Sequence, residues 1–85
     1  MRYVARLHVR PKDDIRDPQG EAVTGALRSL GLDVANVRTG KELIVTFDAA
    51  DEDSANDAVR TMGQELLANP VIEVYEYELK ELARA

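Results

Sequence analysis

The first ten residues alternate between apolar and polar side chains. Arg2, Arg6, His8 and Arg10 occupy even positions, and apolar residues fill the odd positions between them. A repeat of two residues is typical of a strand that is buried on one face only. We therefore expect a strand here whose inward face carries Tyr3, Ala5, Leu7 and Val9.

A helix is expected to follow from Pro18 to Leu30. Asp17 can accept a hydrogen bond from a free N–H of the first turn, and a proline at the first helical position has a φ that already suits a helix. Gly31 supplies the C-terminal cap. Apolar residues recur at helical spacing and should form a stripe that faces the core: Ala22, Val23, Ala26, Leu27 and Leu30.

Two short strands are expected after this helix. Residues 34–38 read as a weak strand, residues 39–41 as a tight turn, and residues 42–47 as a stronger strand rich in apolar and β-branched side chains. The two strands should pair as a hairpin.

A second helix is expected from the cap residue Asp51 to Leu67, before Asn69 and Pro70. Gly63 within it costs about 1 kcal/mol relative to alanine, so we expect it to mark close packing. The buried stripe of this helix should be Ala55, Ala58, Val59, Met62 and Leu66. An extended strand follows at residue 71, and one of its faces should pack on the helices through Val71, Tyr75, Tyr77 and Leu79.

The order strand, helix, strand, strand, helix, strand favours an α+β fold of the ferredoxin-like type. This fold has a four-stranded antiparallel sheet, in the order four, one, three, two, with both helices on one face. Residues 1–85 should form a single domain.

The second face of such a sheet would be uncovered. Its arginines should pair with carboxylates on the neighbouring strands, which are Glu42, Asp48, Glu76 and Glu78. A small apolar strip should lie among them, formed by Val4, Ile44, Ile72 and Val74. An apolar strip with charged borders is typical of a contact surface, so we expect a homodimer or tetramer.

The composition argues against several classes of protein. The chain has 85 residues and a net charge of −5, and phosphate binding needs an excess of Lys and Arg, so we expect no nucleic-acid partner. It has no cysteine, which excludes disulfides and cysteine nucleophiles. The apolar runs are too short to span a bilayer and the first residues do not resemble a signal peptide, so we expect a cytoplasmic protein without a membrane partner.

The sequence offers little for catalysis or metal binding. His8 is the one histidine, and no second metal ligand or assembled triad can be placed beside it. No calcium loop or glycine-rich phosphate loop occurs, so we expect no catalytic, cofactor or metal site. The turn at residues 38–41 carries the charges of Arg38 and Lys41, and there partner contact and simple solvation are both open.

Four segments in chain order resemble one protein family: residues 17–20 (DPQG), 27–31 (LRSLG), 37–41 (VRTGK) and 66–73 (LLANPVIE). They are similar to the small PurS subunit of phosphoribosylformylglycinamidine synthase, and the resemblance covers nearly the whole chain. The charged loop at residues 11–16 and Gly63 depart from the family pattern.

The resemblance implies a function without a reactive residue. In that family a large subunit uses ATP to activate formylglycinamide ribonucleotide and a glutaminase subunit releases ammonia, while the small subunit bridges them as a dimer and supports ammonia transfer. The implied partners are the synthetase (PurL) and glutaminase (PurQ) subunits, and ATP and Mg would bind to the complex instead of this chain. The matching segments supply our candidates for partner contact, which are Asp17, Gln19, Gly20, Arg38, Gly40 and Lys41.

Two other functions stay open on the residues alone. A small-molecule-binding regulatory module can have the same order of elements, although the loop at residues 11–16 offers charges in place of a glycine-rich cup. An acylphosphatase-like enzyme would need an arginine in a phosphate-binding loop and an asparagine on the next strand, for which Arg16 and Asn36 are a loose match.

Overall fold

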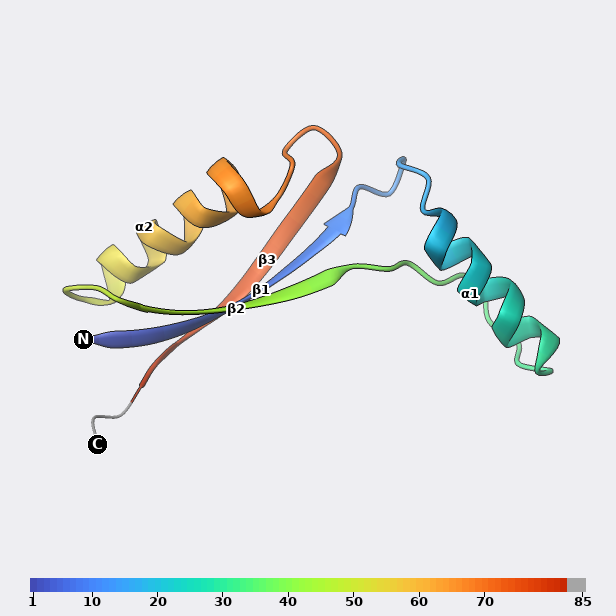
Figure 1. The fold of residues 1–85 in the computed structure, drawn as a ribbon, viewed down its shortest axis with the longest axis horizontal. Coiled ribbons are helices and arrows are strands. Elements are labelled where there is room, and N and C mark those ends of the chain that lie inside the picture. The colour runs from blue at the N-terminus through green and yellow to red at the C-terminus, as the bar shows by residue number, and fades with distance from the viewer. Residues whose placement is uncertain (83–85) are drawn as a thin grey trace.

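The computed structural model describes residues 1–82 as a three-stranded sheet with two helical segments. One segment lies between the first and second strands in the chain, and the other lies between the second and third. The elements are β1 (Arg2–Pro11), α1 (Pro18–Ser29), β2 (Lys41–Asp48), α2 (Glu52–Met62), the π-helical turn η1 (Gly63–Leu67) and β3 (Glu73–Glu81). In Figure 1, α2 lies along the sheet, whereas α1 extends away beyond the ends of the strands.

The molecule is elongated and has two parts. Its radius of gyration is 16.6 Å, compared with about 12 Å for a compact domain of this length. We call the sheet with α2 and η1 the body, and α1 with residues 30–39 the arm.

The sheet of the body is antiparallel throughout, in the order β2-β1-β3. Leu7 at its centre lies opposite Leu43 on one side and Tyr77 on the other. The central place of the first strand and its inward odd positions are confirmed, since Tyr3, Ala5, Leu7 and Val9 are at most 2% exposed. α2 adds Ala55 and Val59 to this core.

The prediction of a strand at residues 34–38 is wrong. Residues 34–38 follow α1 instead of pairing with β2, and side chains of α1 bond to their backbone. Val37 N–H donates to the Thr24 hydroxyl at 2.8 Å, and the guanidinium of Arg28 donates to the carbonyl oxygens of Val34 at 3.1 Å and Ala35 at 2.9 Å. Backbone groups that already have partners gain little from a sheet ladder, so this segment forms none.

The expected burial of the first helix is also wrong. α1 begins as expected, with Asp17 as its cap and Pro18 in its first turn, and Gly31 ends it with a φ of +85°. However, its buried residues are Gly20 and Thr24, while Val23 is 38% and Leu30 is 75% exposed. Because α1 does not cover the sheet, the four-stranded sandwich with both helices on one face is not formed.

The second helix matches its expectation except at its end. Asp51 accepts from Ser54 N–H at 2.8 Å, and Gly63 lies against the ring of Tyr75, where an added Cβ would be 2.5 Å from the nearest ring atom. Leu66, expected inside, is 81% exposed. The π-helical turn adds about one residue to the last turn, so Leu67 and Ala68 point inward in its place.

One face of the sheet is uncovered, as expected. Arg2 pairs with Asp48 at 3.0 Å and Arg10 with Glu76 at 3.4 Å across neighbouring strands. Ile44 is 58% exposed on this face. β3 begins at Glu73, two residues later than expected, so Val71 and Ile72 lie in the preceding turn and are exposed.

Within the described residues 1–82, no helix has the length and apolar character needed to cross a membrane.

Candidate functional site

The candidate contact residues meet where the arm joins the body. The chain crosses this junction twice, once between β1 and α1 and once just before β2. Asp17, Gln19 and Gly20 come from the first crossing, and Arg38, Gly40 and Lys41 from the second. Hydrogen bonds across the junction hold the two crossings side by side.

Asp17 is the central acceptor of the junction and is 6% exposed. Its carboxylate accepts hydrogen bonds from Thr39 N–H at 2.6 Å, from the Thr39 hydroxyl at 2.9 Å and from Gly20 N–H at 3.0 Å. These bonds favour the charged form, and the Thr39 N–H, followed by the Gly20 N–H, lowers the pKa of Asp17. One carboxylate thus ties the first turn of α1 to the segment that enters β2.

The two junction glycines allow close backbone approach. A Cβ on Gly20 would collide with the carbonyl oxygen of Val37, and a Cβ on Gly40 would come within 2.8 Å of the carbonyl oxygen of Val9. Both positions therefore need glycine for packing.

The remaining candidates differ in how much of the side chain is free. Arg38 is half-buried and donates to the carbonyl oxygen of Lys12 at 2.8 Å. Gln19, Gly40 and Lys41 are exposed. Asp17, Gly20 and Arg38 therefore shape the junction, while Gln19, Gly40 and Lys41 present its surface.

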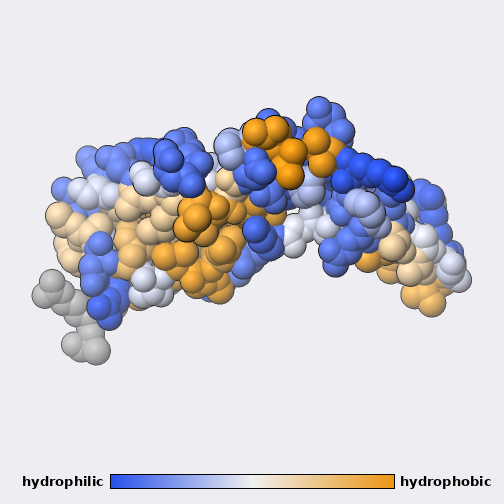
Figure 2. Space-filling model, turned by 45° about the horizontal axis from the view of Figure 1, so that its top comes forward, coloured by the Kyte–Doolittle hydropathy of each residue, from blue (hydrophilic) through white to orange (hydrophobic). Residues whose placement is uncertain are grey.

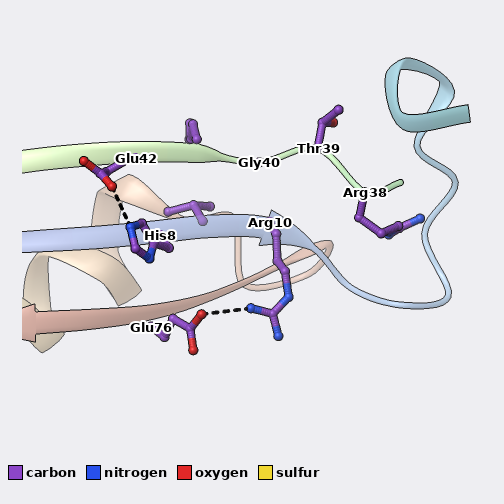
Figure 3. A pocket seen from close by; sticks show the side chains of 9 residues that line it. His8, Arg10, Arg38, Thr39, Gly40, Glu42 and Glu76 are labelled. Carbon is purple, nitrogen blue, oxygen red and sulfur yellow. Dashed lines mark hydrogen bonds and ion pairs between the residues drawn. The ribbon is translucent and has the colours of Figure 1, made fainter. Parts of the chain in front are cut away.

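A shallow hollow of about 350 Å³ lies beside the junction on the uncovered sheet face. Figure 3 shows His8 and Arg10 on this face, with Nε2 of His8 2.7 Å from Glu42 and the Arg10 guanidinium 3.4 Å from Glu76. Arg38 points away from these pairs, toward the loop before α1. The charged groups of the hollow are therefore largely paired with one another.

The hollow contains groups for binding and little for chemistry. Its lining includes the hydroxyl of Thr39, which donates to Asp17, and the ring of His8, whose Nε2 lies 2.7 Å from Glu42. In the part of the chain that the structure describes, no three His, Cys, Asp or Glu side chains are grouped so as to hold a metal ion.

Sequence reasoning missed two threonines that build the junction. Thr24 accepts from Val37 N–H and donates to the Gly20 carbonyl at 2.8 Å, and Thr39 supplies two of the donors to Asp17. A threonine in a helix interior is a weak signal of such a bond, because Ser and Thr hydroxyls commonly return to the carbonyl four residues earlier.

A second groove, of about 310 Å³, lies between η1 and β3. Its lining includes Gly63, Ala68, Pro70 and Tyr75, and the adjoining turn exposes Val71 at 74%. This groove is more apolar than the hollow at the junction.

Comparison with known proteins gives a consistent result. Residues 4–81 match the family model PurS, described as phosphoribosylformylglycinamidine (FGAM) synthase. The FGAM synthase subunit PurS of Synechocystis sp. is 42% identical over 84 residues, which is 98% of this chain and 84% of that protein. The subunit of Bacillus subtilis is 41% identical, covering 94% of this chain and 95% of that protein.

Solved structures resemble the whole fold. The PurS structure of Thermus thermophilus superposes with a TM-score of 0.89 at 49% identity, and the match covers 98% of this chain and 100% of that one. A chain of the PurLQS structure from Thermotoga maritima gives a TM-score of 0.81 at 35% identity, covering 96% of this chain and 99% of that one. The elongated three-stranded shape is therefore shared with experimental structures of similar proteins.

Proposed function

The chain belongs to the PurS family of phosphoribosylformylglycinamidine synthase subunits, and from this premise we propose that it acts as the non-catalytic bridge of that enzyme. The synthase works in purine biosynthesis, and the chain is one of its subunits. The observation that carries the proposal is the match over residues 4–81, which includes both the body and the arm.

The proposed partners are the synthetase subunit PurL and the glutaminase subunit PurQ. The Thermotoga maritima structure is of PurLQS, and its matching chain is covered over 99% of its length. Residues 1–82 show no grouped metal ligands and carry one histidine, which is paired with Glu42, and this fits the role of holding two larger subunits in place.

The physical reason for a bridge lies in the chemistry of ammonia. Ammonia released into water near neutral pH becomes ammonium, which is not a nucleophile. Fixing the glutaminase next to the synthetase raises the effective concentration of ammonia at the second active site. A rigid sheet with an extended arm can do this through shape alone.

We further propose that the junction contacts one of the partners. Gln19, Gly40 and Lys41 would provide the contact surface, and Asp17, Gly20 and Arg38 would hold that surface in shape. Exposed residues on a loop that is braced by a buried acceptor are suited to this task because little conformational entropy is lost on binding.

We also propose that the chain self-associates as a homodimer or tetramer. Two observations support this: the sheet has an uncovered face, and the arm exposes Leu30 and Leu32 at 75% and 51%. Figure 2 shows hydrophobic side chains at the surface of the far end of α1. Apolar surface of this kind is usually covered in an assembly.

The synthase uses ATP, and we propose that ATP and Mg bind on the partner subunits and not on this chain. Residues 1–85 would act as a single domain, and the complex would work in the cytoplasm.

Reconstitution tests the proposal. Purified PurL and PurQ should convert formylglycinamide ribonucleotide with glutamine only when this chain is added, whereas PurL supplied with high ammonia should need it much less. Equal glutamine-dependent turnover with and without the chain contradicts the bridging role.

A charge-reversal variant tests the proposed contact at the junction. Lys41→Glu should weaken complex formation roughly 10-fold, since a reversed charge in a polar interface commonly costs more than 1 kcal/mol. Lys80→Glu, which reverses an exposed charge on β3 far from the junction, is the matched control. Equal complex formation by both variants contradicts a contact at Lys41.

A further inference from the structure

A further pocket lies at the end of the sheet that is remote from the junction, where α2 begins. It has a volume of about 240 Å³ and is lined by the start of the chain, the last residues of β3 and the first residues of α2. The lining consists of Met1, Tyr3, Asp51, Glu52, Leu79 and Glu81. No Lys or Arg is among these described lining residues, so the pocket is strongly anionic.

The fold explains why these residues meet. Tyr3 and Glu81 are Cα partners in the ladder between β1 and β3, and directly opposed residues point to the same face of a sheet. Leu79 lies two residues before Glu81 and therefore shares that face. α2 packs on the same face, and Asp51 caps its first turn. The pocket is thus enclosed by two strands and a helix N-terminus.

The hydroxyl of Tyr3 is the central polar group of the pocket. Tyr3 is 2% exposed, and its ring stacks on Phe47 with the ring centroids 6.0 Å apart. The hydroxyls of Tyr75 and Tyr77 have acceptors at 3.4 Å and 2.8 Å, whereas the Tyr3 hydroxyl has no hydrogen-bond partner within residues 1–82. In the same residues no fully enclosed polar side-chain atom lacks a partner. The Tyr3 hydroxyl therefore faces the open space of the pocket.

The acidic side chains of the pocket act on this hydroxyl. Burial of Tyr3, followed by the charges of Glu81, Asp51 and Glu52, raises the pKa of the phenol. The phenol therefore stays neutral near neutral pH, with one O–H to donate and lone pairs to accept. Three negative charges and one free hydroxyl thus converge on the same space.

These carboxylates lack a counter-charge in the described part of the chain. The ion pairs of residues 1–82 involve none of the three. The Met1 ammonium donates to the carbonyl oxygen of Ala49 at 2.9 Å. Asp51 and Glu52 have a structural reason for their place, since negative charge stabilises the start of a helix. Glu81 and the Tyr3 hydroxyl have no such reason, and a bound cation would satisfy both.

The shape and chemistry of the pocket favour a guanidinium over other cations. A volume of 240 Å³ holds more than one small ion, since a water molecule occupies about 30 Å³. A guanidinium carries five N–H donors in a flat fork, so it can bond to a hydroxyl and to carboxylates at the same time. It is also more weakly hydrated than an ammonium, which suits a pocket with Leu79 as an apolar wall.

We propose that this pocket binds a guanidinium group, which donates hydrogen bonds to the Tyr3 hydroxyl and the Glu81 carboxylate, while Asp51 and Glu52 add negative charge. The site is a property of the single chain, so it goes beyond the bridging role and does not depend on it. The guanidinium can belong to an arginine side chain of a partner subunit or to a free guanidino compound, because both present the same group.

Titration of the whole chain with ethylguanidinium tests the site. Proton–nitrogen NMR spectra should show saturable shifts at Tyr3, Glu52 and Glu81, with a dissociation constant on the order of 1–10 mM for so small a ligand. Ethylammonium is the matched control ligand and should bind at least about 5-fold more weakly, because it has fewer donors and is more strongly hydrated. Shifts that do not saturate overturn the proposal, and equal binding of ethylammonium contradicts the preference for a guanidinium.

Two variants test the proposed contacts. Tyr3→Phe keeps the ring on Phe47 and removes only the hydroxyl, and Glu81→Gln removes one charge. Each should weaken ethylguanidinium binding roughly 10-fold, since each loses a hydrogen bond to a charged group. Glu65→Gln, an exposed position in η1 beyond the far end of α2, is the matched control and should leave binding unchanged. Equal weakening by Glu65→Gln would show a general attraction to an acidic chain and would overturn the site.

Circular dichroism checks that each variant folds. Should Tyr3→Phe be unfolded, Glu81→Gln still decides, because Glu81 is exposed at the end of β3.

Complex formation with PurL and PurQ distinguishes the two sources of the guanidinium. An arginine of a partner subunit predicts that Glu81→Gln weakens the complex roughly 10-fold while Glu65→Gln does not. A free guanidino compound predicts an unchanged complex together with weakened ethylguanidinium binding. Absence of any complex with the unmodified chain contradicts the bridging role and leaves the titration result standing. If Glu81→Gln changes neither ethylguanidinium binding nor complex formation, the proposed site is overturned.

Discussion

The body buries its apolar side chains, whereas the arm exposes its own. Leu7 in the body is completely inaccessible, and Leu30 in the arm is 75% exposed. Residues 34–39 are held to α1 largely by polar bonds, such as those of Thr24 with Val37 and of Asp17 with Thr39. The body is therefore built like a small domain, and the arm like a segment shaped for association.

This difference matters for function because the two parts meet different demands. Burial of apolar surface is the dominant stabilising term in folding, and the buried apolar residues of this chain lie in the body and the turn that follows η1. An arm held by directional hydrogen bonds keeps its geometry while its apolar surface stays free for a partner. If this contrast holds, substitutions in the body and in the arm should differ in their effects on stability.

The largest effect should come from the core of the body. Leu7→Ala should destabilise the protein by about 2–5 kcal/mol, because it leaves a cavity in a packed site. Leu30→Ala removes the same atoms from a site that is 75% exposed in the single chain, and it should change the stability of the dissociated chain by less than about 0.5 kcal/mol. Urea denaturation followed by circular dichroism measures both. Similar losses for the two variants would contradict the contrast.

Replacing a glycine by alanine should destabilise the protein in the body and stabilise it in the arm. Gly63→Ala brings a Cβ against the ring of Tyr75 and should cost roughly 1–3 kcal/mol through overpacking. Gly25 lies within α1 with nothing within 4 Å of an added Cβ, so Gly25→Ala should stabilise the helix by about 0.5–1 kcal/mol. The same denaturation measurement applies, and a destabilising Gly25→Ala would indicate that the arm packs more tightly than described.

The two parts also differ in how well the sequence predicts them. In the body, the alternation from Tyr3 to Val9 and the cap at Asp51 are local signals, and the structure confirms them. The cap at Asp17, where the arm begins, is a local signal of the same kind and is also confirmed. Gly63 was correctly expected to mark close packing. A local pattern suffices where burial and backbone capping decide the outcome.

The arm was predicted less well because its structure depends on longer-range choices. Apolar spacing in α1 indicates an amphipathic helix but cannot say which molecule covers the stripe. Residues 34–38 have the composition of a weak strand, and hydrogen bonds from Thr24 and Arg28 decide against it. Leu66 was misplaced because one extra residue in a π-helical turn changes every later position.

The family resemblance singled out all six candidate contact residues, whereas the charge of the turn at residues 38–41 drew attention to Arg38 and Lys41 alone. The structure brings Asp17 and Arg38 to one junction, although they are far apart in the sequence. The local sequence predicts that Asp17 caps α1, but it gives no sign that the same carboxylate also accepts from Thr39. That second bond depends on the tertiary arrangement.

Removal of one hydroxyl should loosen the arm without affecting the body. Thr24→Val deprives Val37 N–H of its acceptor, and an unpaired backbone donor costs about 1–3 kcal/mol when it is shielded from water. Hydrogen exchange measured by NMR should show lower protection at Val37, with protection at Leu7 nearly unchanged. Thr24→Ser keeps the hydroxyl and is the control. Equal loss across arm and body would mean that the two parts unfold as one unit.

The smallest effect, and the most specific to the junction, is its dependence on pH. Thr39 and Gly20 lower the pKa of Asp17 below its ordinary value of 3.8, so the bond to Thr39 stabilises the junction fully above that value. The stabilisation is lost as the pH falls through the lowered pKa, because protonation then removes the charge that the donors favour. The Thr39 amide resonance should therefore be constant from pH 7 to about pH 5 and change only in stronger acid.

Asp48 and Asp51 in the body also have lowered pKa values, owing to Arg2 and to the Ser54 N–H respectively, so global stability falls in the same acid range.

Asp17→Asn separates the local effect from the global one. In this variant the Thr39 resonance should lose its separate acid transition and follow the body reporter at Leu7. A Thr39 transition that persists in Asp17→Asn would show that another carboxylate controls the junction, and the arm would then be coupled to the body through charge as well as through hydrogen bonds.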